Sequence, residues 1–420
     1  MIRSVTPAVI TGSFLATVPM PPTSLRRSFA IVWLAVSASA QGAAGKAGDK
    51  VRASDLEAFF AEVDKSYPFL DAKGIRKEWT KLQQELRARV ASVKSDEAFL
   101  LLIVDALKGL RDGHATVVES KVKPPPQPEY GPGVSFLPAT DGRVVILQTV
   151  PELARKLPCG TVVVQIDGQP ARKFLDARGD AAWRAGGFFS SPQRARFFEY
   201  RLPLRGKPGD KHVIRYLDQG QEQALELTCR QEISGWPHNH NQPAGLKASA
   251  RSVAWADLDG VGYLYLRRLD ETAEQGIAAA ITALPQAKGW VVDLSGNTGG
   301  GYDNSMRDVL ARLKGPVAVM LDAGCISAGE TLARDLVRGC KARTFGEVTA
   351  GSSSTKKDWK FPSGIATVRF SLQSRSGPDG KPIEFRGITP DEAVEADPQL
   401  MAAGKNTVLE RALAFVRAAR

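Results

Sequence analysis

Four short segments in the last third of the sequence carry residue types suited to hydrolytic chemistry. In the first, DLSGNTGGG at residues 293–301, glycines follow an apolar run, so backbone N–H groups can approach a ligand oxygen without obstruction by a Cβ. A plain turn between a strand and a helix explains the same residues equally well. No GK[ST] follows the glycines, which argues against a phosphate-binding loop.

The second segment, CISAGE at residues 325–330, places Ser327 directly before a predicted helix. A hydroxyl there lies at a helix N-terminus, where the dipole and the free N–H groups favour developing negative charge. Helix capping is the competing explanation, because Ser327 and Glu330 together form a capping box. The third and fourth segments, GEVTAG at 346–351 and PIEFRGITPD at 382–391, indicate little when taken singly.

In this order and spacing, the four segments resemble the motifs of the S41 family of serine peptidases, which includes C-terminal processing (tail-specific) proteases and their tricorn-like relatives. The family pattern DLRxNxGG, SAxE, GExTxG and ExxGVxPD becomes DLSGNTGG, SAGE, GEVTAG and EFRGITPD here. The resemblance covers residues 53–400 and is strongest over 289–391. It implies a serine endopeptidase that needs no cofactor and no metal and that acts on protein or peptide substrates.

Two subtypes of this family differ in the base that activates the serine. In the processing-protease subtype a lysine follows the glycine of the third motif, where this chain has Ser352. In the tricorn-like subtype the base is a histidine in a D-x-H element, supported through polar groups by a glutamate of the last motif. Here Asp112-Gly113-His114 and Glu384 occupy those places, with Gly113 where a serine is often found.

The resemblance therefore implies that Ser327 is the nucleophile, that His114 is its base, and that Glu384 helps to hold the imidazole or its network. A serine hydroxyl needs a neighbouring base near neutral pH, and imidazole is the unperturbed side chain that titrates there. The implied oxyanion hole consists of the N–H of Ala328 with that of Gly300 or Gly299.

Two alternatives remain open at this point. Lys356 or Lys357 could act as the base if burial lowered its pKa by several units, although the polar SSSTKKD context indicates that both are solvated. The chain could also be a catalytically inactive relative that only binds peptides or apolar ligands, since Ser352 and Gly113 replace two family residues.

The elements that must position these residues fall into three predicted parts. Residues 53–125 form a helical region, with helices expected over 54–68, 75–92 and 95–110. The first of these helices is expected to begin at a capping box formed by Ser54 and Glu57.

Residues 126–232 change to short strand-like runs, and the string PELARKLPCGTVVVQIDGQPARKFLD resembles a PDZ domain. The resemblance implies that an extended chain end binds there as an added strand, with Gly131, Gly133 and Val134 in the carboxylate-binding loop. Residues 175–203 exceed the usual PDZ length and suggest an insertion. A purely structural β-domain is the alternative.

Residues 250–420 alternate strands with helices, as in an α/β layer fold. Strands are expected over 261–266, 289–294 and 316–321, and helices over 271–285, 303–314 and 328–339. The predicted fold class is thus α+β multidomain: a helical N-terminal region, a PDZ-like β module and an α/β catalytic core, which the family resemblance implies to be of the crotonase-like ββα type.

The composition agrees with a multidomain globular protein. The 420 residues are 43% apolar and 24% charged, and the net charge of +11 is spread along the chain without the basic, aromatic-rich tracts of a nucleic-acid groove. Residues 1–40 resemble a signal peptide, with Arg26 and Arg27 before an apolar run and Ala38-Ser39-Ala40 at its end. Cleavage near Ala40 would give a periplasmic or secreted protein with no stable membrane span. An uncleaved anchor is the alternative.

A short flexible tail, residues 41–52, is expected after the leader. The cysteines form no recognisable framework, and we expect at least two of them to be buried and unpaired; the four are Cys159, Cys229, Cys325 and Cys340. The closely spaced pair His238 and His240 is weak evidence for a metal site.

Overall fold

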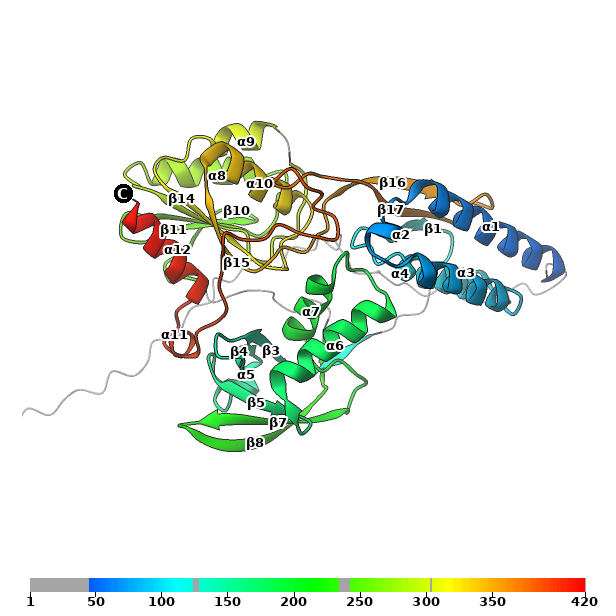
Figure 1. Ribbon diagram of the computed structural model, residues 1–420, viewed down its shortest axis with the longest axis horizontal. Helices are drawn as coiled ribbons and strands as arrows, with labels where there is room; N and C mark the ends of the chain where they lie inside the picture. Colours follow the sequence, from blue (N-terminus) through cyan, green and yellow to red (C-terminus); the bar gives the residue numbers. More distant parts are fainter. Residues whose placement is uncertain (1–44, 124–127, 234–241, 303, 420) are drawn as a thin grey trace, which may run out of the picture. The chain divides into compact units, whose positions relative to one another are not determined.

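A computed structural model describes residues 45–123, 128–233, 242–302 and 304–419 of the protein (Figure 1). Within these ranges the helices and strands pack through their apolar faces. The described residues do not include the predicted leader, residues 1–40, or the histidine pair His238 and His240. Among the helices that are described, none is long and apolar enough to cross a membrane.

The N-terminal region contains four helices, and its strand β1 follows the last of them. Their bounds are α1 (Gly45–Ser66), α2 (Phe69–Ala72), α3 (Arg76–Val90), α4 (Asp96–Gly109) and β1 (Thr116–Ser120). The predictions of helices over 75–92 and 95–110 are confirmed, and Ser95 caps α4 by accepting a hydrogen bond from the Ala98 N–H at 3.2 Å.

The predicted start of the first helix was wrong. Helix α1 begins at Gly45, upstream of Ser54, so part of the expected flexible tail over 41–52 is helical. Arg52 stabilises this extra length, because its guanidinium donates to Asp49 in the same helix at 2.9 Å and to Asp96 at the start of α4 at 3.1 Å.

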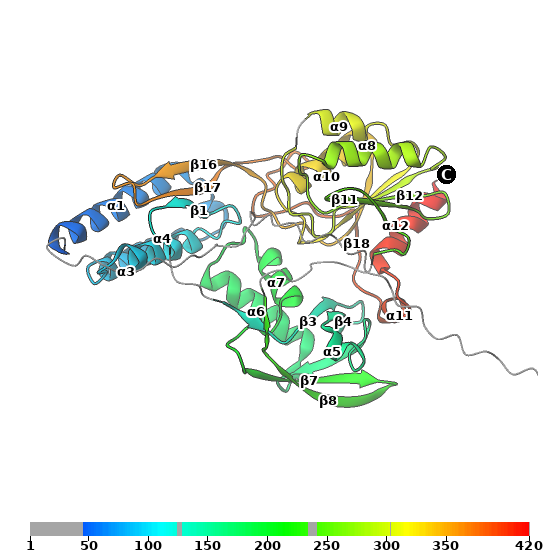
Figure 2. The same cartoon turned by 180° about the vertical axis from the view of Figure 1, so that it is seen from behind.

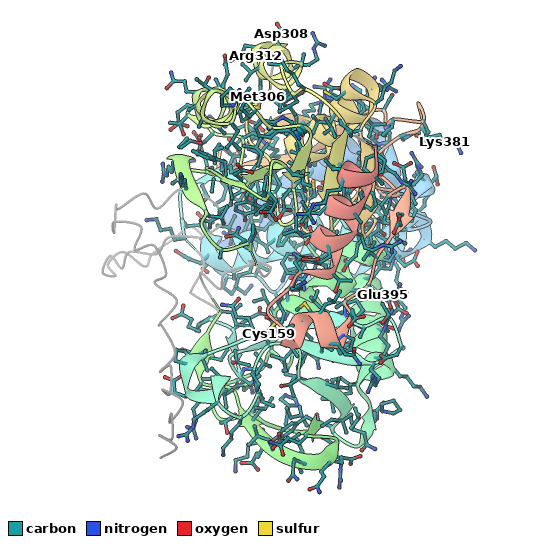
Figure 3. All side chains as sticks on the ribbon, turned by 90° about the vertical axis from the view of Figure 1, so that its left-hand side faces the viewer. Cys159, Met306, Asp308, Arg312, Lys381 and Glu395 are labelled. Atoms are coloured by element: carbon teal, nitrogen blue, oxygen red, sulfur yellow. The ribbon has the colours of Figure 1, made fainter. Side chains whose placement is uncertain are left out.

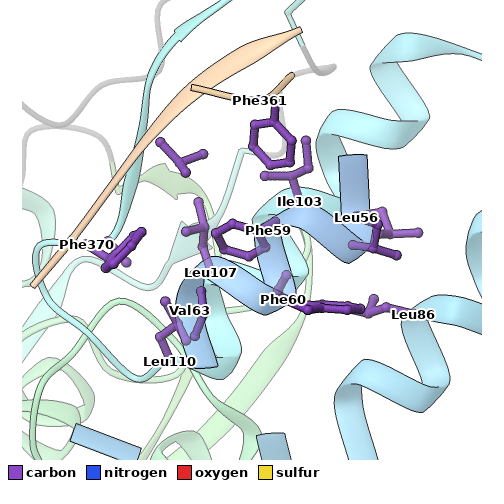
Figure 4. Close-up of a cluster of buried hydrophobic side chains, with 14 of the residues drawn as sticks. Leu56, Phe59, Phe60, Val63, Leu86, Ile103, Leu107, Leu110, Phe361 and Phe370 are labelled. Carbon is purple, nitrogen blue, oxygen red and sulfur yellow. The ribbon is translucent and has the colours of Figure 1, made fainter. Parts of the chain in front are cut away.

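A hairpin from the far end of the chain completes the core of this helical region. Strands β16 (Ser354–Lys360) and β17 (Ala366–Ser374) form a three-stranded sheet with β1, in which β1 pairs antiparallel with β17. Phe361 and Phe370 of the hairpin segment lie in one buried cluster with Phe59 of α1 and Leu107 of α4 (Figure 4). The N-terminal helices therefore bury their apolar faces against residues more than 200 positions later in the sequence.

The module over 128–233 is built on an antiparallel sheet in the order β3-β4-β5-β7-β8. Its strands are β2 (Tyr130–Gly131), β3 (Val134–Pro138), β4 (Val144–Thr149), β5 (Val162–Ile166), β6 (Gln169–Pro170), β7 (Lys211–Asp218), β8 (Gln221–Thr228) and β9 (Gln231–Glu232), and its helices are α5 (Pro151–Ala154), α6 (Ala171–Ala185) and α7 (Pro192–Arg201). The long stretch over 175–203 thus supplies most of α6 and all of α7.

The C-terminal core has a seven-stranded sheet in the order β10-β11-β12-β13-β14-β15-β18, parallel from β12 onward. Its strands are β10 (Lys247–Ala250), β11 (Val253–Asp257), β12 (Gly262–Leu266), β13 (Trp290–Asp293), β14 (Val317–Leu321), β15 (Arg343–Gly346) and β18 (Glu392–Ala393). Its helices are α8 (Ala273–Ala283), α9 (Asn304–Leu310), α10 (Ala328–Cys340), α11 (Pro398–Ala402) and α12 (Thr407–Ala418). The strands and helices predicted between 261 and 339 are confirmed.

Alternate residues of the central strands point to opposite faces of this sheet, as strand geometry requires. Val292 and Val319 belong to the cluster under α8, α9 and α10, whereas Val291 and Met320 belong to the cluster under α12. Figure 2 shows these helices on opposite sides of the sheet. The carboxyl ends of β13, β14 and β15 consequently meet along one edge, and the three motif loops leave the sheet there.

The cysteines follow the prediction that at least two are buried and unpaired: Cys229 and Cys325 are both. Cys159 belongs to the module and packs beside Ala396 and Met401, close to α11 (Figure 3).

Replacing Phe370 by alanine should destabilise the protein strongly, because the ring is fully buried between the hairpin and the N-terminal helices. We expect a loss of about 3–5 kcal/mol in the free energy of unfolding, measured by urea denaturation. Val118→Ala, at an exposed position of β1, is the control and should change stability by less than about 0.5 kcal/mol. Equal effects of the two substitutions would contradict the shared core.

Candidate active site

Ser327 occupies a strained turn between β14 and α10. Its φ of 56° and ψ of −120° lie in a region that residues other than glycine rarely adopt. Two bonds from its N–H hold this conformation: one to the carbonyl of Ser352 at 2.8 Å and one to Oε2 of Glu330 at 3.2 Å. The capping interaction expected of Glu330 is therefore present, and the turn presents the Ser327 hydroxyl to a histidine.

That histidine is His114, in the loop between α4 and β1, with its Nε2 3.1 Å from Ser327 Oγ. Asp112 fixes the loop, since its buried carboxylate accepts from the His114 N–H at 2.8 Å. The same carboxylate accepts from the N–H of Ser371 at 2.7 Å and from its hydroxyl at 2.9 Å. Because Ser371 lies in β17, the histidine loop is attached directly to the hairpin.

The surroundings of His114 keep its imidazole neutral. Burial lowers its pKa to about 4, with the charges of Lys356 and Lys73 acting in the same direction and the carboxylate of Asp112 opposing them. Near pH 7 the ring is therefore neutral, so one of its two nitrogens is unprotonated and can accept a proton.

Glu384 does not contact the imidazole directly; it pairs with a lysine that the sequence analysis missed. Lys73 Nζ lies 3.1 Å from Glu384 Oε1, and neither side chain is exposed to solvent. The ammonium also donates to the hydroxyl of Tyr67 at 2.9 Å and to the carbonyl of Arg111 at 2.7 Å. Burial raises the pKa of Glu384 to about 7, while Lys73 pulls it down. No local motif marks Lys73, since its role arises only from tertiary contact.

The glycine loop after β13 lies against the turn that carries Ser327. A Cβ on Gly299 would be 2.8 Å from that of Ser327, and a Cβ on Gly300 would be 2.0 Å from the carbonyl oxygen of Leu269, so only glycine fits at either position. Gly299 N–H already donates to Asn297 Oδ1 at 2.9 Å.

The N–H groups of Gly300 and Ala328 have no hydrogen-bond acceptor in the described part of the chain. Of the donors named from the sequence, these two are therefore available to a developing oxyanion.

Comparisons with known proteins agree with the motifs. Residues 305–394 match the model described as Peptidase family S41. Over 166 residues the chain is 24% identical to the carboxy-terminal processing protease CtpA of Bacillus subtilis (strain 168), a match that covers 33% of this chain and 35% of that protein. Residues 305–394 are thus similar to peptidase family S41. In the match with CtpA, the chain spans about a third of the length of the curated relative.

Solved structures show that the chain shares its mixed helix-and-sheet fold with mature CPAF. The complex of mature CPAF with lactacystin has a TM-score of 0.60 at 12% identity and covers 88% of this chain and 98% of that chain. A second structure of mature CPAF has a TM-score of 0.57 at 12% identity and covers 85% of this chain and 94% of that chain.

Neither of the two lysines considered as alternative bases is hydrogen bonded to Ser327 among the described residues. Lys357 Nζ donates to Glu62 and, at 3.4 Å, to Ser66, both in α1. Lys356 is partly buried, which lowers its pKa, but it makes no contact with Ser327 among the residues described. Of the three candidate bases, His114 is the one with a hydrogen bond to Ser327 Oγ in the described part of the chain.

The predicted peptide-binding residues lie in the module, where they line a small apolar hollow with Leu202, Pro203 and Ile233; they are Gly131, Gly133 and Val134. Strand β3 is an edge strand, but part of its edge already has partners. Arg201 donates to the carbonyl of Phe136 at 3.0 Å, and the N–H of Ala396 donates to that of Pro138 at 3.1 Å. A peptide strand would have to displace these contacts.

No group of three potential metal ligands occurs within the described ranges. Of the other histidines, His212 lies in β7 and its Nδ1 is hydrogen bonded to Asp167 at 2.7 Å.

The depressed pKa of His114 predicts a pH-dependent contribution to stability. Because the pKa is about 4 in the folded state and 6.5 as the ordinary value, the unfolded chain binds more protons between these limits. The stability due to neutral His114 is therefore lost as the pH falls from 6.5 towards 4, by at most about 1.4 kcal/mol per pH unit.

Urea denaturation of the wild type and of His114→Asn at pH 7.5 and pH 5 measures this contribution. The stability advantage of the wild type should shrink at pH 5. The raised pKa of Glu384 acts in the opposite direction but is present in both proteins, so it largely cancels in the comparison. An advantage that grows at pH 5 would contradict the prediction.

Proposed function

We propose that this protein is a serine endopeptidase in which Ser327 is the nucleophile and His114 the base. The observation that carries the proposal is the 3.1 Å approach of His114 Nε2 to Ser327 Oγ on a strained turn. As Oγ attacks the peptide carbonyl, Nε2 takes the hydroxyl proton and then delivers it to the leaving amine. Water, activated by the same imidazole, hydrolyses the resulting acyl-enzyme.

The N–H groups of Gly300 and Ala328 would receive the oxyanion of the tetrahedral intermediate. Their lack of other acceptors in the described residues supports this role, since a donor already in use could not serve without breaking a bond. Such a donor typically contributes a few kcal/mol to transition-state stabilisation.

We propose that its substrates are proteins or peptides, cleaved near a C-terminal tail. The name of the CtpA relative refers to carboxy-terminal processing. We further propose export, on the strength of the leader-like residues 1–40.

Ser327→Ala should abolish hydrolysis of an unfolded protein substrate, with a loss of at least about 10³-fold, while leaving the unfolding transition unchanged. His114→Ala should lose activity to a similar extent, because the hydroxyl then lacks a base. The double variant of Lys356 and Lys357 to alanine is the matched control and should stay active. Loss of activity in this double variant with retention in His114→Ala would support the Ser–Lys alternative.

Labelling by a serine-directed organophosphorus probe separates an enzyme from an inactive peptide-binding relative. An activated Ser327 reacts covalently, whereas an ordinary hydroxyl does not. We expect stoichiometric labelling of the wild type at Ser327 and none of Ser327→Ala. An unlabelled, correctly folded wild type would leave the protein a binding module.

We also propose that the module recruits apolar chain ends through the loop that contains Gly131, Gly133 and Val134. Full-length Ser327→Ala should then bind an apolar peptide with a free carboxylate more tightly than its amide, because the loop N–H groups recognise the carboxylate. Equal affinities, measured by fluorescence anisotropy, would leave the module a structural role.

A further inference from the structure

The side of His114 that faces away from the nucleophile contacts an unexpected residue. Gly113 has no side chain to offer, and instead the hydroxyl of Ser352 lies 3.4 Å from His114 Nδ1. A Cβ on Gly113 would be only 2.6 Å from this same oxygen. Ser352 Oγ therefore occupies the space into which a side chain at position 113 would extend.

Glycine at position 113 is not required by the backbone, because its φ is not in the left-handed region. The absence of a side chain at Gly113 thus leaves space that the hydroxyl of Ser352 fills. Ser352 is itself held firmly, since its N–H donates to Glu330 at 3.0 Å and its carbonyl accepts from Ser327.

A second buried hydroxyl extends the contact towards Glu384. Ser190 Oγ donates to Ser352 Oγ at 3.2 Å and accepts from the Gly113 N–H at 3.0 Å. The Ser190 hydroxyl also acts to lower the pKa of the Glu384 carboxylate, against the larger opposite effect of burial. Glu384 Oε2 is buried and has no hydrogen-bond partner in the described part of the molecule, whereas Oε1 pairs with Lys73.

Ser190 comes from the segment between α6 and α7, within the stretch that is longer than a PDZ domain needs. Two further hydrogen bonds join the residues that follow Ser190 to the loop of the third motif. Ser191 Oγ donates to the carbonyl of Ala350 at 2.6 Å, and Gln193 Nε2 donates to that of Thr349 at 3.2 Å.

We propose that Ser352 and Ser190 are positioning residues that together replace the side chain missing at Gly113 and connect His114 to the Glu384–Lys73 pair. This inference rests on the proposed function. With Nδ1–H donating to Ser352 Oγ, the proton is kept off Nε2, which stays free to accept from Ser327. When the imidazolium forms, the two hydroxyls can turn so that each donates towards Glu384. No proton leaves the imidazole along this path; only the hydroxyl dipoles reorient.

Exchanging the two positions tests the proposal. Ser352→Ala should lower kcat by about 10–100-fold, the usual effect of losing a residue that orients a ligand or base, with KM nearly unchanged. Gly113→Ser alone should also lower kcat, because its Cβ meets Ser352 Oγ. The double variant Gly113→Ser/Ser352→Ala removes the clash and returns a hydroxyl to the site, so its kcat should exceed that of both single variants.

Ser190→Ala should lower kcat in the same manner, and Ser92→Ala, at an exposed serine, is the matched control. Wild-type kcat in both Ser352→Ala and Ser190→Ala would overturn the proposal, as would a double variant no better than its parents.

A measurement that needs no activity separates this proposal from the proposed function. The ¹⁵N shifts of His114 report which ring nitrogen carries the proton. Wild type and the double variant should hold it on Nδ1, and Ser352→Ala should show a mixture of tautomers. A tautomer that is the same in all three proteins would overturn the positioning role, even if hydrolysis is absent.

Discussion

The pairing of β1 with β17 is the constraint on which the rest of the site depends. Strand β1 begins two residues after His114, and β17 carries Ser371, to which Asp112 is bonded. The hairpin that contains β17 leaves the third motif loop immediately after Ser352 and Ser353. The β16–β17 hairpin therefore contacts the histidine loop through β17, and its first strand begins directly after the residues that bond to the Ser327 turn. Its aromatic side chains are buried in the core of the N-terminal helices.

Three buried ionisable side chains, Lys73, Glu384 and Glu330, hold the loops around the candidate site in place. Lys73 and Glu384 are removed from water as a pair, an arrangement that gains little net stability because desolvation offsets most of the Coulomb attraction. The contribution of the pair lies in position, since it holds the Glu384 carboxyl group in the interior against the loop that carries His114. Glu330, buried with a pKa raised to about 7, organises the opposite side by accepting from Thr349 Oγ1 at 2.6 Å and from Gly351 N–H at 2.8 Å.

The sequence predicts those parts of the site that are encoded locally. The glycine loop and the turn at Ser327 each follow an apolar strand, so their meeting at one sheet edge follows from parallel topology. Lys73 and Ser190 could not be found in this way, because each acts through partners distant in sequence. The start of α1 was missed for a related reason: Ser54 and Glu57 match a capping box, but the ion pairs of Arg52 extend the helix upstream of it.

The packing of the N-terminal helices against the β16–β17 hairpin also fixes the order in which the parts of the protein can fold. During synthesis from the N-terminus, the helices of residues 45–109 emerge long before Phe361 and Phe370, so their apolar faces lack a partner until the hairpin leaves the ribosome. Contacts of such long sequence separation form late and slowly. A chain that ends before residue 384 consequently cannot bring His114, Ser327 and Glu384 together, so the candidate site forms only after the hairpin and the fourth motif have been synthesised.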